Sequence, residues 1–352
     1  MNNIGILYKA KNSESPNDDV GVTANLHLNY WKLPGEKQFD RFIDIGLMIY
    51  EAGNNIDELC FYFPFTVNES DLEDLAGVLS KDNLLCVLFG CDYKLRNEDQ
   101  AYTFVETYTE DKQSFWLYNL DKTNFSINAR DEGTIVKIKI LTSPKNQLII
   151  NKKESKTRNL VKNHTHLKNN NSEKINYNLY IRFRINNISE KNQFKCEDIS
   201  NDFIQSAFSK TELIDFRINE KNEFAKPIYE ELSNLGIFFD FSKFHFYFIG
   251  SSLDEQIIGQ TTYEECKLLD SEKWKPYIGN HNKLNKQCIA YHWDVEIKHN
   301  KYHIFIRTIF SNSNVWKIIK YLFVILAIGI TTSSIFELLR FIIKIIYLRY
   351  IK

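Results

Sequence analysis

A long apolar run near the carboxyl end constrains this sequence more than any other stretch. Residues 321–336 carry no charge, and with Ile318 and Ile319 the run approaches the ~20 residues that cross the hydrocarbon core of a bilayer. Eleven Leu, Ile, Val or Phe side chains lie between Ile318 and Phe336. Each favours insertion near the bilayer centre by about 0.3–0.6 kcal/mol. The alternative, a helix buried in a soluble core, rarely needs so long an apolar run, so we predict a transmembrane helix over residues 315–336.

The side chains at the ends of this run suit a membrane interface. Lys and Arg can carry their charge to the lipid headgroups on flexible stems, and Trp and Tyr are enriched at the bilayer surface. The predicted membrane contacts are Trp316, Lys320, Tyr321, Phe323, Ile325, Leu326, Arg340 and Lys344.

A basic segment follows the predicted span. Glu337, Arg340 and Lys344 recur on one helical face while apolar side chains turn away from it, which is typical of a helix that lies in an interface. Six basic residues and one acidic residue fall from residue 315 onward, in a chain whose net charge is −1. Because anionic lipids attract this charge, we predict a basic amphipathic tail over residues 337–352.

The amino terminus bears on the orientation. Residues 1–15 lack a basic segment followed by a long apolar core, so we expect no secretory signal and expect the preceding domains to stay in the cytosol, anchored to the inner (cytoplasmic) membrane. A single span then places the basic tail outside, against the positive-inside tendency. A short hairpin that breaks at residues 329–334 removes this conflict and is the alternative to the single span.

The composition of the remaining chain favours strands. Phe, Tyr and Trp make up 14% of the residues, and aromatic side chains are enriched in β-sheets. Six cysteines occur singly, without a CxxC pair, which fits a reducing compartment. About 310 residues before the predicted span leave room for two domains with their own cores.

The first 141 residues alternate between apolar and polar side chains. This period of two predicts strands with one buried face. Pro64 marks the third strand as an edge or an end, and Ser70 and Glu73 form a capping box that predicts a short helix to Ser80. Strands are predicted at residues 20–30, 43–49, 59–67, 84–89, 101–109, 114–120, 125–129 and 134–141.

Residues 174–312 show the same alternation of apolar and polar side chains. Its last two strands flank His299 and Asn300, which predicts a tight hairpin, and residues 311–314 form a short joint to the membrane helix. Strands are predicted at residues 175–185, 212–219, 244–250, 289–298 and 302–310, and helices at 202–209 and 227–235. The expected fold class is mainly β (α+β), with two antiparallel, sandwich-like β domains at 1–141 and 174–312, a few short helices and a C-terminal transmembrane helix.

A polar, basic stretch separates the two domains. Residues 142–173 read as an exposed linker or long loop. Clustered cations also bind phosphates, but no aromatic residues interleave here to stack bases, so a nucleic-acid partner is not favoured. His164 and His166 have no further ligands at a suitable spacing, and neither a metal nor a cofactor is predicted.

No catalytic motif is present. The sequence contains no G-x-S-x-G elbow, P-loop, HExxH or dinucleotide fingerprint. His292 shares a strand face with Asp294, while His245 and His303 lie on other strands, so these residues meet only if the strands pair. The alternative is that these are polar side chains without a catalytic role on a solvent-exposed face of a sheet. The candidate ligand-binding residues, for an anionic ligand, are Arg182, Arg184, Arg217 and His292.

Three functions fit these features. The first is a non-enzymatic, membrane-anchored sensor that binds a protein or a small anionic ligand and localises or transmits that event through its helix. The second is a membrane-perturbing or pore-forming effector, as in bacterial cell-suicide or antiphage proteins, assembled as a homo-oligomer through the membrane segment. The third is a membrane-proximal hydrolase that uses His292 and Asp294.

Overall fold

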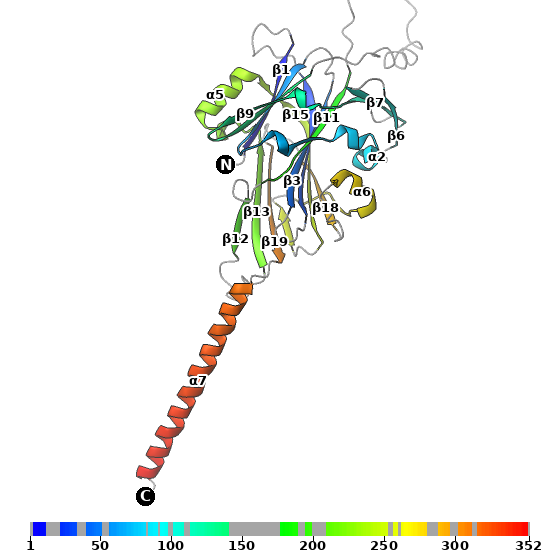
Figure 1. Cartoon of the computed structure of the whole chain (residues 1–352). Helices are drawn as coiled ribbons and strands as arrows, with labels where there is room; N and C mark the ends of the chain where they lie inside the picture. The colour runs from blue at the N-terminus through cyan, green and yellow to red at the C-terminus, as the bar shows by residue number, and fades with distance from the viewer. Residues whose placement is uncertain are drawn as a thin grey trace, which may run out of the picture. The chain divides into compact units, whose positions relative to one another are not determined.

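Two units make up the chain in its computed structural model (Figure 1). The first comprises residues 1–195, 214–252 and 258–306, and the second comprises residues 196–213, 253–257 and 307–352. The structure describes residues 3–11, 22–33, 40–50, 56–81, 84–90, 92–97, 101–108, 113–140, 177–188, 194–198, 209–252, 256–259, 262–279, 288–295, 302–311 and 315–350. The predicted linker at 142–173 and the predicted turn at His299 and Asn300 lie outside these residues.

Strands dominate the described chain, and the mainly β (α+β) fold class is confirmed. The strands are β1 (Asn3–Ala10), β2 (Thr23–Leu33), β3 (Asp40–Ile49), β4 (Ile56–Phe63), β5 (Leu72–Asp74), β6 (Tyr93–Asn97), β7 (Tyr102–Thr107), β8 (Phe115–Tyr118), β9 (Phe125–Arg130), β10 (Gly133–Lys139), β11 (Leu179–Ile185), β12 (Phe194–Asp198), β13 (Ser209–Ile218), β14 (Ile237–Phe238), β15 (Asp240–Ser251), β16 (Gln256–Gly259), β17 (Glu265–Leu268), β18 (Cys288–Val295) and β19 (Tyr302–Ser311). The helices are α1 (Ala76–Leu79), α2 (Leu84–Phe89), α5 (Lys226–Leu235), α6 (Ser271–Ile278) and α7 (Val315–Tyr350), with short 3-10 turns at Glu69–Asp71, Lys122–Asn124 and Lys221–Glu223.

The strands form two mixed sheets. The larger sheet has the order β17-β18-β15-β2-β3-β11-β8-β7-β6, and β5 pairs with β11. The other has the order β16-β19-β13-β1-β4-β10-β9, with β12 beside β13 and β14 beside β1. Three described pairs are parallel, namely β1 with β13, β8 with β11 and β2 with β15. Parallel neighbours need long connections, so strands from both halves of the sequence share each sheet.

Aromatic side chains pack between the sheets within the first unit. The ring centroids of Phe61 on β4 and Phe183 on β11 lie 5.1 Å apart, and those of Tyr30 on β2 and Phe216 on β13 lie 5.8 Å apart. These rings come from the apolar positions of the predicted alternation, and β4 ends directly before Pro64 as expected. The inner faces of the two sheets therefore form a sandwich-like core.

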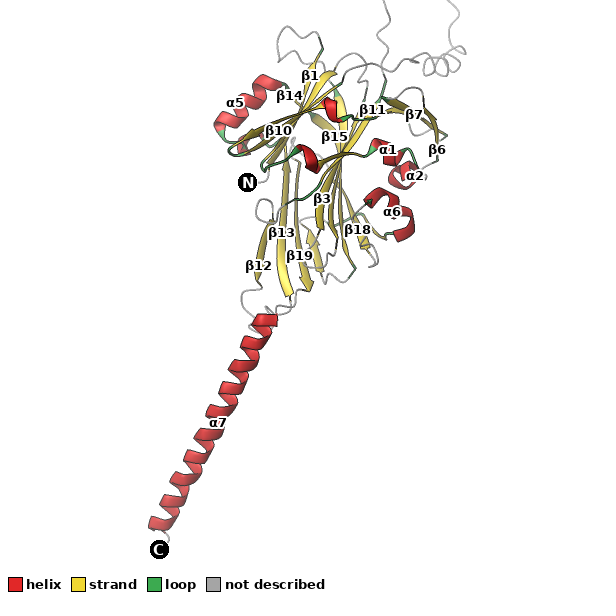
Figure 2. Ribbon diagram, viewed as in Figure 1, coloured by secondary structure: helices red, strands yellow, loops and turns green. Residues whose placement is uncertain are grey.

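The opposite face of the larger sheet is covered by helices. The helices α1, α2 and α6 lie together beside this sheet (Figure 2). Leu79, Leu84 and Tyr277 from these helices are buried in one cluster with Trp31 and Tyr180 of the sheet. Polar positions of β2, β3 and β11 are consequently shielded from water, although their alternation suggested a wet face.

Two local predictions are wrong. Residues 84–89 form the helix α2 rather than a strand, because so short an apolar run fits either element and burial of Leu84 and Leu85 against the cluster decides for the helix. The last two strands do not form a hairpin, because β18 lies in the larger sheet and β19 in the other. Short spacing along the chain therefore did not indicate which sheet each strand joins.

Several other elements differ in detail. A capping box is present, but it joins Asn68 to Asp71 and opens a 3-10 turn followed by β5. The helix predicted at 227–235 is confirmed as α5, with Pro227 in its first turn. The helix predicted at 202–209 lies outside the described residues except for Ser209, which begins β13. Strand β1 was not predicted.

The helix α7 belongs to the second unit and is continuous from Val315 to Tyr350. The stretch Ile318–Tyr350 is long and apolar enough to cross a membrane. No part of its most apolar 18 residues is buried against the rest of the chain. The break at residues 329–334 that the hairpin alternative requires is absent, since α7 is continuous there. Hydroxyl groups in this stretch donate to carbonyls of the preceding turn: Thr332 Oγ1 to Ile328 O at 2.7 Å and Ser334 Oγ to Ile330 O at 2.9 Å. The hairpin alternative therefore fails, and the predicted basic tail continues the same helix.

Most of the predicted membrane contacts whose side chains are described are exposed, and Tyr321 is half-buried. Phe323, Ile325 and Leu326 are each 59–70% exposed. Arg340 lies 3.6 Å from Glu337 and 5.5 Å from the centroid of the Phe336 ring. The Trp316 side chain lies outside the described part of the chain. The exposed apolar surface of α7 has the length and composition of a single-pass anchor.

Candidate ligand-binding site

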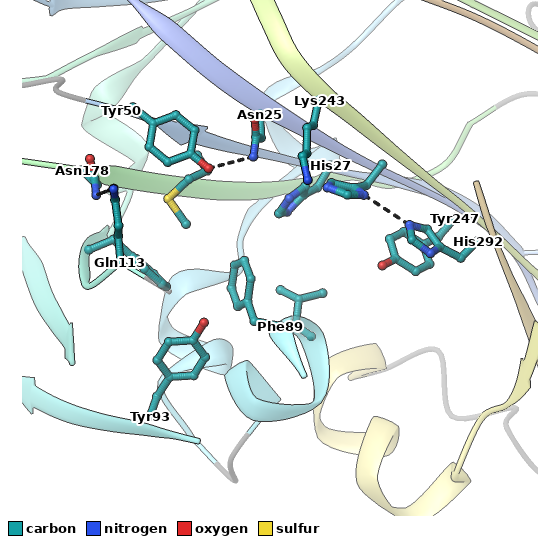
Figure 3. A pocket seen from close by; sticks show the side chains of 14 residues that line it. Asn25, His27, Tyr50, Phe89, Tyr93, Gln113, Asn178, Lys243, Tyr247 and His292 are labelled. Atoms are coloured by element: carbon teal, nitrogen blue, oxygen red, sulfur yellow. Dashed lines mark hydrogen bonds between the residues drawn. The ribbon is translucent and has the colours of Figure 1, made fainter. Parts of the chain in front are cut away.

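The helix-covered face of the larger sheet contains a pocket of about 520 Å³ (Figure 3). This volume falls within the range of ~300–1,000 Å³ that is common for small-molecule sites. We call it the histidine pocket. It is lined by Asn25, His27, Met48, Tyr50, Leu88, Phe89, Tyr93, Gln113, Phe115, Asn178, Lys243, His245, Tyr247 and His292.

Strand register brings three histidines together. The strands β2, β15 and β18 are neighbours, and the register sets His245 beside His27 on one side and beside Asp294 on the other. The next outward-facing position of β15, Tyr247, is paired with His292. Because side chains of a strand alternate between its faces, all these residues project from the same side of the sheet.

The imidazole rings contact one another directly. His245 Nδ1 lies 3.3 Å from His292 Nε2, and the ring centroids of His27 and His245 are 5.2 Å apart. His27 Nδ1 lies 3.2 Å from the hydroxyl of Tyr180. The ring of Tyr247 stacks on His292 with centroids 4.3 Å apart and planes inclined by 10°. The three rings are thus held as a row with little freedom to turn.

Burial keeps these histidines neutral at pH 7. Burial lowers the pKa of His27 well below its ordinary value, and the neighbouring His245 lowers it further. Burial also lowers the pKa of His245 against the opposing effect of Asp294, and lowers that of His292 against Glu264 and Asp294. A neutral imidazole offers one N–H donor and one nitrogen acceptor. The row therefore presents hydrogen-bonding groups rather than fixed positive charges.

Amide side chains line the other end of the pocket. Asn25 Nδ2 donates to the Tyr50 hydroxyl at 2.7 Å, and Asn178 Nδ2 donates to Gln113 Oε1 at 2.7 Å. Asn25 Oδ1 is buried and accepts no hydrogen bond from any residue that the structure describes. Leaving a buried acceptor unsatisfied costs about 1–3 kcal/mol, so this oxygen is a ready acceptor for a ligand donor.

Aromatic rings face the sheet across the pocket. Phe89 on α2 and Tyr93 on β6 lie opposite Asn25 and His27 (Figure 3). The Phe89 centroid is 5.9 Å from that of Tyr93 and 5.4 Å from that of Phe115. Such a wall suits a flat ring, because aromatic pairs favour tilted or offset contacts at these distances.

A buried group of charges lies next to the pocket on the same sheet face. We call Arg182, Arg184, Asp44, Tyr180 and Tyr277 the arginine cluster. Arg184 Nε donates to Asp44 Oδ1 at 2.7 Å, and Arg182 Nε donates to the Tyr277 hydroxyl at 2.7 Å. The Tyr277 hydroxyl donates to Asp44 Oδ2 at 2.8 Å, and Arg182 Nη1 donates to the Tyr180 hydroxyl at 2.9 Å. Tyr180 connects this network to His27.

The arginine cluster holds more positive than negative charge. Asp44, Arg182 and Arg184 are at most 1% exposed, so one buried carboxylate faces two guanidinium groups. Glu73, at 3.9 Å from Arg184, is 44% exposed and better screened by water. Arg182 Nη2 is buried without a hydrogen-bond partner in the described residues and lies 4.0 Å from Asp44. The cluster thus places a positive field beside the histidine pocket.

The cationic patch predicted from sequence does not assemble. Arg217 lies on β13 in the other sheet, where it contacts Asp215 at 3.0 Å and Glu223 at 2.9 Å. Arg182 and Arg184 are neighbours in the buried arginine cluster and do not form a ligand-binding surface. His303, also considered, lies 2.7 Å from Asp215. Of the predicted ligand-binding residues, only His292 lines the histidine pocket.

Sequence reasoning missed most of the pocket residues. His27, Asn25 and Lys243 occupy polar positions in strands whose other positions are apolar, and that alternation was the available signal. The alternation does not indicate which strands are neighbours, and β2 and β15 are separated by more than half of the chain. Within the described residues, no group of three or more His, Cys, Asp or Glu is arranged to hold a metal ion.

The fold and the pocket define a class: a mainly β chain with a small-molecule-sized pocket and an apolar C-terminal helix. No known family model matches the chain, and no curated protein resembles it closely enough to count as a match.

Proposed function

We propose that this protein is a non-enzymatic, membrane-anchored sensor that binds a small ligand in the histidine pocket. The observation that carries the proposal is the pocket itself, because it combines aromatic walls with a few converging polar groups. Sites of that composition are the default binding sites of proteins. The ligand is recognised by the amides at one end and by Lys243 and the histidines at the other.

Binding is favoured over catalysis by what lines the pocket. None of its described lining residues is a Ser, Thr, Cys, Asp or Glu, the side chains that most often act as nucleophiles or carboxylate bases. The histidines are held by one another and by Tyr180 and Tyr247. A rigid, neutral set of donors and acceptors suits recognition.

The helix α7 supplies the proposed anchor. Its exposed apolar surface supports a single span, and we propose that this span lies in the inner (cytoplasmic) membrane. The described cysteines Cys60, Cys86, Cys266 and Cys288 form no disulfide. This supports placement of the first unit, which contains them, in the reducing cytosol. Ligand binding by the first unit would then be localised at, or signalled to, the membrane.

Thermal denaturation tests the binding proposal. The purified full chain in detergent is heated with and without a small-molecule extract of cells. A ligand at about 100 times its Kd stabilises the folded state by about 2.7 kcal/mol, so the extract should raise the Tm by several degrees. The variant His292→Gln should lose this shift, whereas His303→Gln, on the other sheet, should keep it. No shift with any extract, or an equal shift in both variants, contradicts the proposal.

A second candidate function uses the same histidines for hydrolysis. His245 Nδ1 lies 3.3 Å from His292 Nε2, so its N–H can donate to His292 while Nε2 of His245 accepts a proton from water. Asp294, at 3.8 Å, is beyond hydrogen-bond distance and acts on His245 through its charge. This candidate predicts that His245→Gln abolishes turnover of a substrate that still binds. Turnover that persists in the folded variant eliminates it.

A further inference from the structure

We infer that the ligand of the histidine pocket is a nucleotide, held with its base at the Gln113 end and its phosphate at Lys243. This inference rests on the proposed function and names its ligand class. Three observations carry it: an aromatic and amide end, a buried amide atom without a partner among the described residues in the middle, and an exposed lysine at the other end.

The base end is formed by rings and amides. Tyr93 and Phe115 lie with ring centroids 5.8 Å apart at an interplanar angle of 73°, and the hydrogen-bonded amides of Gln113 and Asn178 stand beside them in the pocket wall. Aromatic faces stack on any nucleobase, and amide side chains match the paired donors and acceptors on a base edge.

The middle of the pocket offers an acceptor that lacks a donor. Asn25 Oδ1 is buried, and no described residue donates to it. If the amide turned, the Tyr50 hydroxyl would donate to Oδ1 instead, so either orientation leaves one polar atom of Asn25 without a partner among the described residues. A hydroxyl of a ribose supplies the missing donor, and it would lie between a base at Gln113 and a phosphate at Lys243.

The end of the histidine pocket opposite Gln113 carries the positive charge of Lys243. Lys243 is exposed on β15 in the pocket wall, directly beside Asn25 in the strand register. The charged side chains of the arginine cluster lie on β3 and β11, on the opposite side of β2 from β15, so they are not part of the charge at Lys243. The acidic side chains Glu264, Glu265 and Asp294 act on the His292 side of the site, where Lys267 partly offsets them. These charges direct a phosphate toward Lys243 and away from β17.

The spacing of the strands fits this order. Asn178 precedes β11, Tyr50 follows β3, Asn25 lies on β2 and Lys243 on β15, and these strands are consecutive in the sheet. Neighbouring strands are about 4.8 Å apart, so the site is roughly 14 Å wide from the first to the last of them. A base, a sugar and a phosphate in line occupy such a length.

Titration calorimetry with three probes tests the inference. The purified full chain in detergent is titrated with adenosine 5′-monophosphate, adenosine and ribose 5-phosphate. The monophosphate should bind, and each of the two fragments should bind at least tenfold more weakly, since each lacks one end of the ligand. Guanosine, cytidine and uridine monophosphates complete the panel and report which base the Gln113 end prefers.

Matched lysine variants locate the phosphate. Lys243→Gln should weaken nucleotide binding about tenfold and leave adenosine binding unchanged. Lys139→Gln, which removes an exposed lysine on β10 in the other sheet, should have no effect, and circular dichroism checks that both variants are folded. The inference is overturned if none of the four monophosphates binds at millimolar concentration, or if Lys243→Gln binds them as tightly as the unaltered chain. If the extract still raises the Tm in a His292-dependent way, the proposed function stands and only the nucleotide is wrong.

Discussion

Gly46 is the residue with the strictest steric constraint on the polar face of the larger sheet. It stands on β3 between His27 on β2 and Arg182 on β11 in the strand register. A Cβ atom there would collide with the hydroxyl of Tyr180 and lie 3.0 Å from Arg182 Nη1. The absence of a side chain lets Tyr180 reach both His27 and Arg182.

Substitution of Gly46 should therefore be costly. We expect Gly46→Ala to lower the free energy of unfolding by about 1–3 kcal/mol, the usual penalty for overpacking a core. Gly77→Ala is the matched control, because a Cβ at this helical position meets nothing within 4 Å and Ala favours helix over Gly by up to ~1 kcal/mol. Urea denaturation of both variants measures the difference. Equal stability of the two would show that Tyr180 does not occupy the space above Gly46.

The buried histidines should make the fold sensitive to acid. Their pKa values are lowered from the usual 6.5, so below about pH 6.5 the unfolded chain binds protons that the folded chain does not. Stability is then fully present above that pH and falls as the pH drops toward the lowered values. Asp74 acts in the opposite sense, because burial raises its pKa to about 6 and protonation relieves the cost of its buried charge.

Comparing variants separates these two effects. Unfolding free energies measured between pH 7.5 and 5 should fall less steeply for His27→Gln than for the unaltered chain, because one of the depressed groups is gone. Asp74→Asn should instead make the fall steeper, because it removes the group that acts in the opposite sense. A slope in His27→Gln identical to that of the unaltered chain contradicts a neutral, buried His27.

At the scale of elements, α2 holds the aromatic wall of the histidine pocket against the sheet. Leu84 is 1% exposed within the helix-covered cluster, whereas Val87 on the same helix is 40% exposed. Leu84→Ala should lower the free energy of unfolding by about 2–4 kcal/mol, since it removes buried methyl groups and leaves a cavity. Val87→Ala should change it by less than about 0.5 kcal/mol. Chemical denaturation distinguishes them, and similar losses would mean that α2 does not pack as described.

Elements with a clear period of two could be predicted from sequence. The strands β2, β3 and β11 show alternation over at least seven residues, and their bounds follow it closely. The helix α2 could not be predicted, because six apolar residues carry no distinguishing period. The sequence predicts Arg182 and Arg184 as ligand-binding residues, but they are buried because α1, α2 and α6 come from distant segments to cover that face of the sheet. Local pattern reports which face a residue is on, but not what covers that face.

At the scale of the whole molecule, the length of α7 exceeds what a bilayer core requires. Its 36 residues extend for ~54 Å at 1.5 Å per residue, whereas the hydrocarbon core is about 30 Å thick. Residues 318–336 are enough to fill that core, and Glu337, Arg340 and Lys344 then reach the headgroup region beyond it. This division agrees with the charge pattern, in which the uncharged run ends at Phe336.

In the proposed function, one chain joins a small-molecule pocket to a membrane anchor. Native mass spectrometry of the full chain, extracted with detergent from membranes washed at alkaline pH, measures both parts together. The account predicts that the chain remains in the washed membranes and carries a small molecule, that His292→Gln remains there without it, and that a chain ending at Asn312 is washed away. A full chain released by the wash, or one retained with an empty pocket in the presence of cell extract, would contradict it.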